Sequence, residues 1–458
     1  MTAAAVTPEQ RKKILTVLFI SLLLDLISFT FILPLFPKLL EFYRSLEPPG
    51  HSSNSLLNRV FASLNAYKNS FARPISDRYD IVLLGGALGS LFSLLQAIAS
   101  PIIGGLSDRY GRRTALLWSM VGNILSVALW VAAVDFRTFL ASRVVGGLSE
   151  GNVQLAMAIA TDVSDERSRG STMAMVGVCF SIAFTLGPAL GAALSNVTTV
   201  SANPFATAAG FSLVLLVVET LYLYLYLPET LPKDPQPSRT GSAPNAAQAG
   251  KANKAAEINV RTNSLLTLNF THLVFLLIFS GMEFSLPFMT YDLFAYGSSQ
   301  SGRLLGFIGL TASLLQGSFT RRSPPLRVVQ TGVVSCAASF FLLARVQTQG
   351  MLYIAAALLA VTSATVVTGL TSLASFEAGV QERGGKLGNH RSWGQVGRAT
   401  GPLIFCTLYW WAGREVAYIT GGVGMLGVCG LVFGALRAPP GTDRKAPKGG
   451  ESHEVKRP

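Results

Sequence analysis

Ionisable side chains inside otherwise apolar stretches are the residues of this sequence best placed to do chemistry. They include Asp25, Arg143, Glu150 and Glu283. A charge inside a bilayer is costly, so such a residue usually faces a water-filled path or a partner of opposite charge. The chemistry we expect from them is the binding and release of protons or of small organic ions.

Apolar runs long enough to cross a membrane must position these side chains. A bilayer core about 30 Å thick needs ~20 apolar residues per helix, and half of the 458 residues are hydrophobic. Twelve such runs occur, at 14–37, 80–103, 115–133, 137–160, 171–195, 205–227, 269–291, 303–319, 326–344, 351–375, 392–410 and 416–436. The sequence therefore predicts an all-α polytopic membrane protein.

Six runs precede and six follow a segment rich in Pro, Ser, Ala, Asn and Lys. We expect a cytosolic N-terminus (1–13), a first bundle (14–227, with a long outer loop at 38–79), a cytosolic linker (228–268), a second bundle (269–436) and a basic tail (437–458). Gly187-Pro188 in the first half recurs as Gly401-Pro402 in the second. This recurrence indicates internal duplication; the alternative is chance recurrence of common residues. We interpret these motifs, with Gly191, as hinges.

The Lys and Arg residues are distributed unevenly between the predicted loops. With the N-terminus inside, cytosolic segments hold 25 of the 37, whereas the short outer loops hold three. This bias predicts that both termini are cytosolic. The net charge of +13 is then explained by topology and contact with anionic lipids, and nucleic acid is not an expected partner.

The stretch "GGLSDRYGRRTALL", from Gly104 to Leu117, concentrates charge between two apolar runs. Near the start of the helix that follows, Asp108 would be favoured by the helix dipole. We expect the cluster to act as a cytosolic gate, holding one state closed and breaking when two halves move; the alternative is a basic anchor without a gating role. "GSFTRRS", from Gly317, is a degenerate copy, displaced along the chain by almost the same distance as the second Gly-Pro motif.

This stretch resembles the loop 2–3 motif of the major facilitator superfamily, G-x-L-x-D-R-x-G-R-[RK]. The matching residues are Gly104, Leu106, Asp108, Arg109, Gly111, Arg112 and Arg113. "RVVGG", containing Arg143, and "GPALGA", from Gly187, resemble further motifs of the superfamily, although Ala192 replaces the last glycine of its antiporter motif. The run around Asp25 resembles the first helix of bacterial tetracycline:proton antiporters.

The resemblance implies twelve transmembrane helices in two pseudo-symmetric six-helix bundles. It also implies a secondary active transporter that works by alternating access, as a monomer and without a cofactor. The drug:proton branch suggests proton-coupled export of amphipathic organic ions, and its animal tetracycline-transporter-like members favour organic anions. A transporter-fold receptor or scaffold without transport, and a facilitative uniporter of another small organic solute, are the alternatives.

Each candidate residue carries more than one interpretation. Asp25 is either a proton-coupling group or the static partner of an arginine. Arg143 and Glu150 are seven residues apart, so on a continuous helix they share one face with Gln154; Glu150 is a second proton site or the counter-ion of Arg143. Arg398 pairs with an anionic substrate or with a gate acid such as Asp108.

Three further residues carry weaker expectations. Glu219 lies in a run that we expect at the periphery, protonated near lipid or directly functional. His390 and Arg391 are expected at the cytosolic edge, facing a loop.

Other features limit the function further. The four cysteines lie within apolar runs and the four histidines are scattered, so neither a disulfide framework nor a metal site is expected. No motif of a hydrolase, metalloprotease or P-loop enzyme is present, which argues against an enzyme. Asn196 opens an N-x-T sequence in a predicted outer loop and is a possible glycosylation site, on a protein of the plasma membrane or an endomembrane.

Overall fold

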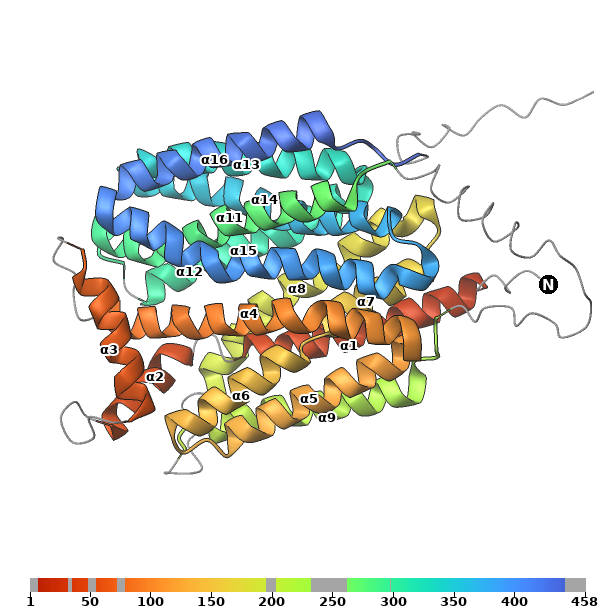
Figure 1. Ribbon diagram of the computed structural model, residues 1–458, viewed down its shortest axis with the longest axis horizontal. Coiled ribbons are helices and arrows are strands. Elements are labelled where there is room, and N and C mark those ends of the chain that lie inside the picture. Colours follow the sequence, from red (N-terminus) through yellow and green to blue (C-terminus); the bar gives the residue numbers. More distant parts are fainter. Residues whose placement is uncertain are drawn as a thin grey trace, which may run out of the picture.

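The protein consists of long helices that lie side by side with roughly aligned axes (Figure 1). The computed structural model describes residues 7–31, 35–47, 55–71, 79–194, 203–231, 262–296 and 298–440. Within these ranges, nine helices are long and apolar enough to cross a membrane. The three remaining predicted runs are also helical, but one is broken, one ends in a π-helical turn and one has a polar first half.

The first half of the chain is built from helices that pack around two apolar clusters. They are α1 (Pro8–Thr30), α2 (Phe36–Leu46), α3 (Leu56–Asn69), α4 (Tyr79–Tyr110), α5 (Arg112–Val131), α6 (Phe136–Ser149), α7 (Asn152–Asp162), α8 (Glu166–Leu194) and α9 (Ala206–Tyr226). A capping box at Thr7 and Gln10 begins α1. Pro101 and Pro287 are accommodated inside the long helices α4 and α11.

The second half forms the other bundle around its own large apolar cluster. Its elements are α11 (Leu265–Phe294), α12 (Ser298–Leu315), the π-helical turn η1 (Gln316–Thr320), α13 (Pro325–Ala344), α14 (Gln349–Phe376), the 3-10 turn η2 (Val380–Glu382), α15 (Arg383–Ala412) and α16 (Arg414–Ala435). The bundles meet where α4 lies along α15 and where α8 lies against α12 and α14.

The fourth predicted helix is not continuous, which corrects the expectation of one helix over 137–160. α6 ends at Ser149 and α7 begins at Asn152, with Glu150 and Gly151 between them. The hydroxyl of Ser119 on α5 serves both sides of this break. It donates to the carbonyl of Ser149 and accepts the backbone N–H of Gly151 at 2.9 Å, so the interrupted backbone remains hydrogen-bonded.

The predicted outer loop 38–79 contains two amphipathic helices. Tyr43 on α2 donates to the carbonyl of Ala133 at 3.2 Å and packs on Phe136. α3 contacts both bundles: Lys68 pairs with Asp80 of α4 at 2.5 Å, and its neighbour Tyr67 contacts Thr407 of α15. The described part of this loop is therefore ordered and covers one end of the helices.

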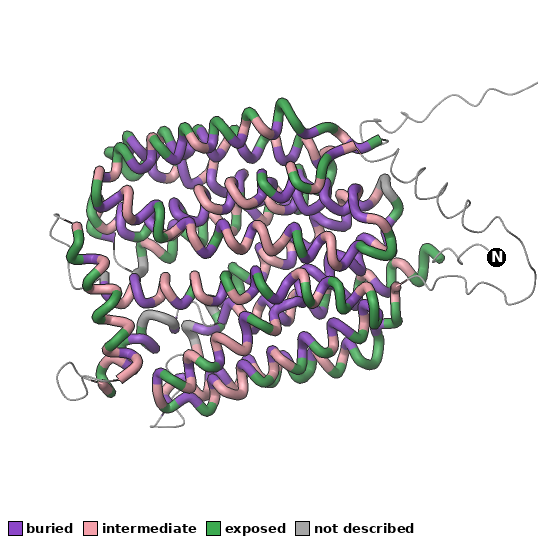
Figure 2. The backbone as a smooth tube through the Cα atoms, viewed as in Figure 1, coloured by how far each residue is buried: buried purple, intermediate pink, exposed green. Residues whose placement is uncertain are grey.

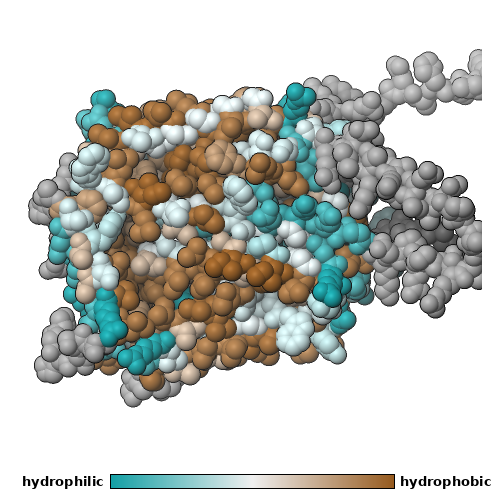
Figure 3. Space-filling model, in the orientation of Figure 1, coloured by the Kyte–Doolittle hydropathy of each residue, from teal (hydrophilic) through white to brown (hydrophobic). Residues whose placement is uncertain are grey.

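We call that end the loop side and the opposite end, where α1 begins and α16 ends, the termini side. Burial alternates along most helices, with exposed residues outward (Figure 2). On the face in Figure 3, hydrophobic residues form a broad band between more hydrophilic ends. Large exposed side chains such as Trp118 and Trp411 are favourable when this band faces lipid.

Candidate functional site

An open cleft lies in the first bundle, with about 440 Å³ of space not filled by atoms when the part open to solvent is included. Its polar lining consists of Asp25, Ser28, Asn123, Ser126, Arg143, Glu150 and Ser212. Its aromatic lining consists of Phe29, Phe92 and Trp130. Polar groups that converge beside aromatic side chains in one cleft are typical of a site for a small amphipathic molecule.

Asp25 reaches this cleft from α1, and the residue is 3% exposed. Oδ1 accepts a hydrogen bond from the side-chain amide of Asn152 at 2.9 Å. Oδ2 is buried and has no hydrogen-bond partner among the described residues. A buried carboxylate with one satisfied oxygen has room to accept a proton or a donor group from another molecule.

Glu150 and Arg143 face the same cleft, although no direct ion pair forms between them in the described chain. The break after α6 turns Glu150 inward, where it accepts from the side-chain amide of Asn123 at 3.4 Å. The guanidinium of Arg143 lies over the ring of Phe92, 4.6 Å from its centre, a cation–π arrangement. A guanidinium beside an aromatic ring can still donate its N–H groups to a hydrogen-bonding partner.

Gln154 does not continue the polar stripe of Arg143 and Glu150, because the helix break places it on a separate segment. Its side-chain amide donates to the carbonyl of Ser100 at 2.8 Å. Gln154 therefore holds α7 against α4 and is absent from the cleft lining.

The second bundle contributes Arg391 to the same region, which corrects the expectation that this residue faces a loop. Arg391 lies within α15, and the neighbouring Ser392 donates to the carbonyl of Ala97 on α4 at 2.6 Å. The charge of Arg391 acts on both Asp25 and Glu150. Its Nε is buried without a hydrogen-bond partner in the described structure.

His390 also points inward, although the sequence suggested scattered histidines and a loop-facing side chain. Its ring stacks on His272 of α11, with centroids 4.3 Å apart, and its Nδ1 contacts the side-chain oxygen of Asn269 at 2.9 Å. The Nε2 atoms of both histidines are buried without a partner among the described residues. The part of the chain that the structure describes contains no cluster of three or more metal-binding side chains.

Two expected site residues lie away from the cleft lining. Glu283 is exposed on α11, and Arg398 is exposed on α15. Within the described ranges, Arg398 makes no hydrogen bond with Asp108, which binds to other residues described below. The predicted pairing of Arg398 with that gate acid is therefore absent from this conformation.

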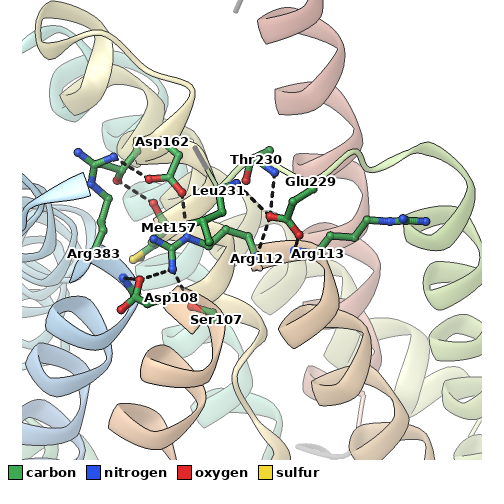
Figure 4. A network of polar contacts seen from close by, with 12 residues as sticks. Ser107, Asp108, Arg112, Arg113, Met157, Asp162, Glu229, Thr230, Leu231 and Arg383 are labelled. Atoms are coloured by element: carbon green, nitrogen blue, oxygen red, sulfur yellow. Dashed lines mark hydrogen bonds and ion pairs between the residues drawn. The ribbon is translucent and has the colours of Figure 1, made fainter. Parts of the chain in front are cut away.

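A charged network joins the bundles at the termini side (Figure 4). The side chain of Asp162, at the end of α7, is fully buried and accepts from Arg112 at 2.8 Å and from Arg383 at 2.6 Å. Arg112 also donates to Asp108 at 2.5 Å and to Ser107 at 2.8 Å. We call these five residues the termini-side network.

Asp108 lies in the last turn of α4, and not at the start of α5 as the sequence suggested. Its two oxygens accept the backbone N–H groups of Gly384 and Gly385 at 2.8 and 2.6 Å. These N–H groups belong to the first turn of α15, so the carboxylate caps a helix of the opposite bundle.

Glu229 occupies the position that Asp108 was expected to take. It accepts the backbone N–H groups of Arg112 and Arg113 at 2.8 and 3.2 Å, at the start of α5. Gly111 has φ +104°, and a Cβ there would overlap Glu229. A glycine is therefore required both by the backbone and by the capping carboxylate.

The other motif arginines lie nearer the surface. Arg113 donates to the carbonyl of Tyr224 at 2.6 Å, and Arg109 is exposed with its guanidinium beside Tyr110. Gly104 allows α4 and α15 to touch, because a Cβ there would overlap the carbonyl oxygen of Gly384.

The predicted hinge motifs are points of close helix packing within each bundle. Gly187 of α8 packs on Thr30 of α1, and Gly401 of α15 packs on the carbonyl of Leu277 in α11. Pro402 lies within α15, and Gly191 is buried in α8. The side chain of Pro188, and the whole of Asn196, lie outside the described residues.

Comparison with known proteins agrees with this architecture. The family model described as Major Facilitator Superfamily matches residues 18–402. Major facilitator superfamily domain-containing protein 10 of Mus musculus is 34% identical over 428 residues, 90% of each chain. Tetracycline resistance protein, class E, of Escherichia coli is 27% identical over 362 residues, 77% of this chain and 84% of that protein.

A solved structure matches closely as well. The crystal structure described as the human organic anion transporter MFSD10 (TETRAN) superposes with a TM-score of 0.81 at 32% identity. The match covers 93% of this chain and 100% of that one.

Proposed function

The chain belongs to the major facilitator superfamily, a family of transporters and not of enzymes, and from this we propose that it exports amphipathic organic anions by proton-coupled alternating access. Two relatives support the class of substrate. One solved structure is described as an organic anion transporter, and the bacterial relative is a tetracycline resistance protein by its printed name.

The observation that carries this proposal is a cleft lined by two acids and an arginine of the first bundle, with an arginine of the second bundle within electrostatic reach of both acids. Asp25 and Glu150 come from the first bundle with Arg143, and Arg391 approaches from the second. A group that gains and loses a proton next to a cation changes how strongly that cation attracts an anion. Proton binding and anion binding are thereby linked, as coupled transport requires.

The termini-side network supplies the gate in this proposal. In the present conformation Asp108 and Asp162 connect the bundles through Gly384, Gly385 and Arg383. These contacts must break when the bundles rock to open this side. Each is local, so a bound substrate or proton can shift the balance between the two states.

We further propose that the termini side is cytosolic, because the basic residues concentrate in the segments of that side and positive charge is retained inside. We also propose that the protein works as a monomer, in the plasma membrane or an endomembrane. The predicted glycosylation at Asn196 would lie on the outer side.

Flux measurements in proteoliposomes test the proposal. Purified protein is reconstituted, and uptake of labelled organic anions and cations is compared with and without an imposed pH gradient. We expect gradient-driven accumulation of an anion in the wild type. Asp25→Asn should abolish this accumulation and retain exchange of labelled for unlabelled substrate, because binding and rocking need no net proton movement.

Other outcomes point to the alternatives. Uptake that ignores the pH gradient indicates a uniporter, and absence of flux in folded protein indicates a scaffold or receptor. Accumulation of cations alone contradicts the proposed substrate class. Undiminished gradient-driven accumulation by Asp25→Asn shows that the coupling group is another residue.

A further inference from the structure

A polar row runs along the contact between α1 and α9. Ser21, Asp25 and Ser28 are spaced by four and three residues, so they share one face of α1. Two positions of α9, seven residues apart, meet this face. Ser21 Oγ donates to Glu219 Oε1 at 2.7 Å, and the hydroxyls of Ser28 and Ser212 lie 2.5 Å apart.

Glu219 is buried in this contact and is not exposed at the periphery. The residue is 1% exposed, and in the described structure Oε2 is buried without a hydrogen-bond partner. Among the described residues no basic side chain forms an ion pair with it. An ionised carboxylate in such a place would be strongly destabilised, and this burial favours the neutral carboxyl.

The charged groups around Glu219 favour the same state. The carboxyls of Asp25 on α1 and of Glu150 beyond it both lie within electrostatic reach of Glu219. On the α5 side, Arg113 is engaged with the carbonyl of Tyr224, five residues further along α9. Two carboxyls within electrostatic reach do not readily ionise together, so their protons are shared between them.

The position of Glu219 separates it from the cleft. Asp25, Ser28 and Ser212 line the cleft, whereas Ser21 and Glu219 do not. α1 begins at the termini side, so Ser21 and its partner Glu219 lie one helical turn nearer that side than Asp25. The row therefore leads from the cleft floor into the first bundle, toward the termini side.

We propose that Glu219 is a second proton-binding site that receives the transported proton from Asp25. This deepens the proposed function and rests on its proton coupling. Glu219 first releases its own proton toward the termini side and becomes a carboxylate. In this conformation of the described chain, Asp25 makes no hydrogen bond with Ser21, so its protonated carboxyl must first turn toward Ser21. The O–H bond of Asp25 then breaks, Ser21 Oγ takes this proton and gives its own to Glu219, and Asp25 is left as a carboxylate with Ser21 unchanged.

In this scheme the proton and the organic anion leave by different routes. The anion leaves the cleft through the space that opens between the bundles when they rock, and the proton follows the α1–α9 contact inside the first bundle. Leu18 and Leu223, both buried, separate Glu219 from the termini side in this conformation. Proton release therefore requires this apolar stretch to open.

Glu219→Gln is the decisive variant, because glutamine keeps an oxygen for Ser21 but cannot exchange a proton. In proteoliposomes with an imposed pH gradient, we expect loss of substrate accumulation with retained exchange, as for Asp25→Asn. Ser21→Ala should slow gradient-driven uptake about tenfold or more while both carboxyls remain. Thr220→Val is the matched control on the same helix, since the hydroxyl of Thr220 donates to the carbonyl of Leu216 in its own helix, and it should transport like the wild type.

Infrared difference spectroscopy of the purified protein gives a readout that needs no transport. The carbonyl band of a protonated carboxylic acid should be present at neutral pH and missing in Glu219→Gln. The pH at which this band disappears should shift in Asp25→Asn, because the two sites are coupled.

The outcomes separate this proposal from the proposed function. Wild-type accumulation in Glu219→Gln overturns the proton transfer and leaves Glu219 a structural acid. A protonated-acid band that is unaffected by Asp25→Asn overturns it as well. If the wild type itself accumulates nothing, proton-coupled transport fails, and the infrared titration alone still decides whether Glu219 and Asp25 share protons.

Discussion

Arg391 shows how a single residue gains its meaning from the fold. It belongs to α15, yet its charge acts on Asp25 and Glu150 of the other bundle. Its buried Nε, unpartnered among the described residues, leaves this guanidinium with unused donor capacity. Arginine is suited to bind a carboxylate or a sulfonate with two parallel hydrogen bonds.

Removing that charge should weaken anion binding. For Arg391→Gln we expect a rise of about tenfold in the KM for the transported anion, equivalent to ~1.4 kcal/mol, with little effect on protein folding. Concentration-dependent exchange in proteoliposomes measures this. Lys386→Gln removes the same charge from a partly exposed position of α15 and serves as the control; equal KM values for the two variants would contradict a direct role.

Among the helices, α15 is unusual because a residue of the opposite bundle caps it. Asp108 accepts two N–H groups of its first turn, and the residue that precedes α15, Glu382, makes no side-chain cap. A carboxylate at a helix N-terminus is stabilising by ~0.3–1 kcal/mol, and up to ~2 kcal/mol when partly buried. The capping energy of α15 therefore depends on the bundles being together on this side.

Asp108→Asn should consequently loosen the termini side. Loss of the charge should favour separation of α4 from α15 by ~1 kcal/mol. A cysteine introduced at Ser392, which faces Ala97 of α4, should then react about five times faster with a soluble thiol reagent. Asp165→Asn, which affects an exposed pair with Arg11 within the first half, should leave the rate unchanged. An unchanged rate in Asp108→Asn would contradict the gating role.

α6 begins with a conventional cap on the loop side. Oδ1 of Asp135 accepts the backbone N–H of Thr138 at 2.9 Å, and hydrogen bonding by Thr138 lowers the pKa of Asp135 below its ordinary value. A lowered pKa means that the charged cap stabilises the fold above the ordinary aspartate pKa. That stabilisation is lost as the pH falls through the lowered value.

Asp135→Ala should therefore reduce the free energy of unfolding by ~1 kcal/mol near neutral pH. Asp135→Asn keeps a capping oxygen and should lose less. Thermal unfolding in detergent measures both. The difference between aspartate and asparagine should shrink when the pH falls below about 3, under the ordinary aspartate pKa of ~3.9; a difference that grows on acidification would contradict the charged cap.

At the scale of the whole molecule, the internal duplication relates contacts across the two bundles. Arg169 and Arg383 are separated along the chain by the same interval as the two Gly-Pro motifs. Each reaches the end of a helix in the opposite bundle. Arg383 donates to Asp162, and Arg169 donates to the carbonyl of Ser375 at 3.3 Å and lies over Phe376.

The symmetry is incomplete where the gate is concerned. Arg321 occupies the position in the degenerate copy that corresponds to Asp108, and it donates to Ser171 of α8 at 3.3 Å. The contact between α4 and α15 therefore has a carboxylate that caps a helix of the opposite bundle. The related contact with α8 has an arginine in its place. We expect the two bundle contacts to open with different energies.

Arg383→Ala should open the termini side more than Arg169→Ala. The first leaves the buried carboxylate of Asp162 with Arg112 alone, and losing a buried ionic partner costs up to ~3–5 kcal/mol. The second removes a bond to a neutral carbonyl, worth ~1–3 kcal/mol. Distances between spin labels on α4 and α15 measure the opening, and Asp162→Asn combined with Arg383→Ala should be less than additive. Equal opening by the two arginine variants would contradict this ranking.

The sequence by itself determined the helices, the twofold division and the transporter family. Long apolar runs leave few alternatives to membrane-spanning helices, because the backbone must satisfy its own hydrogen bonds in lipid. The sequence did not predict the helix break at Glu150, because a hydroxyl of α5 stabilises it. It did not predict the helices α2 and α3 either, and contacts with both bundles position α3.

Only the tertiary structure decided which charges meet. Asp108 bonds to the first turn of α15, in the opposite half of the chain, Glu229 takes its expected place, and Arg391, His390 and Glu219 turn inward. Helical periodicity specifies which residues share a face of one helix. It does not specify which face of another helix lies opposite, because that depends on how the whole bundle packs, and this packing decides which charged side chains meet at the cleft.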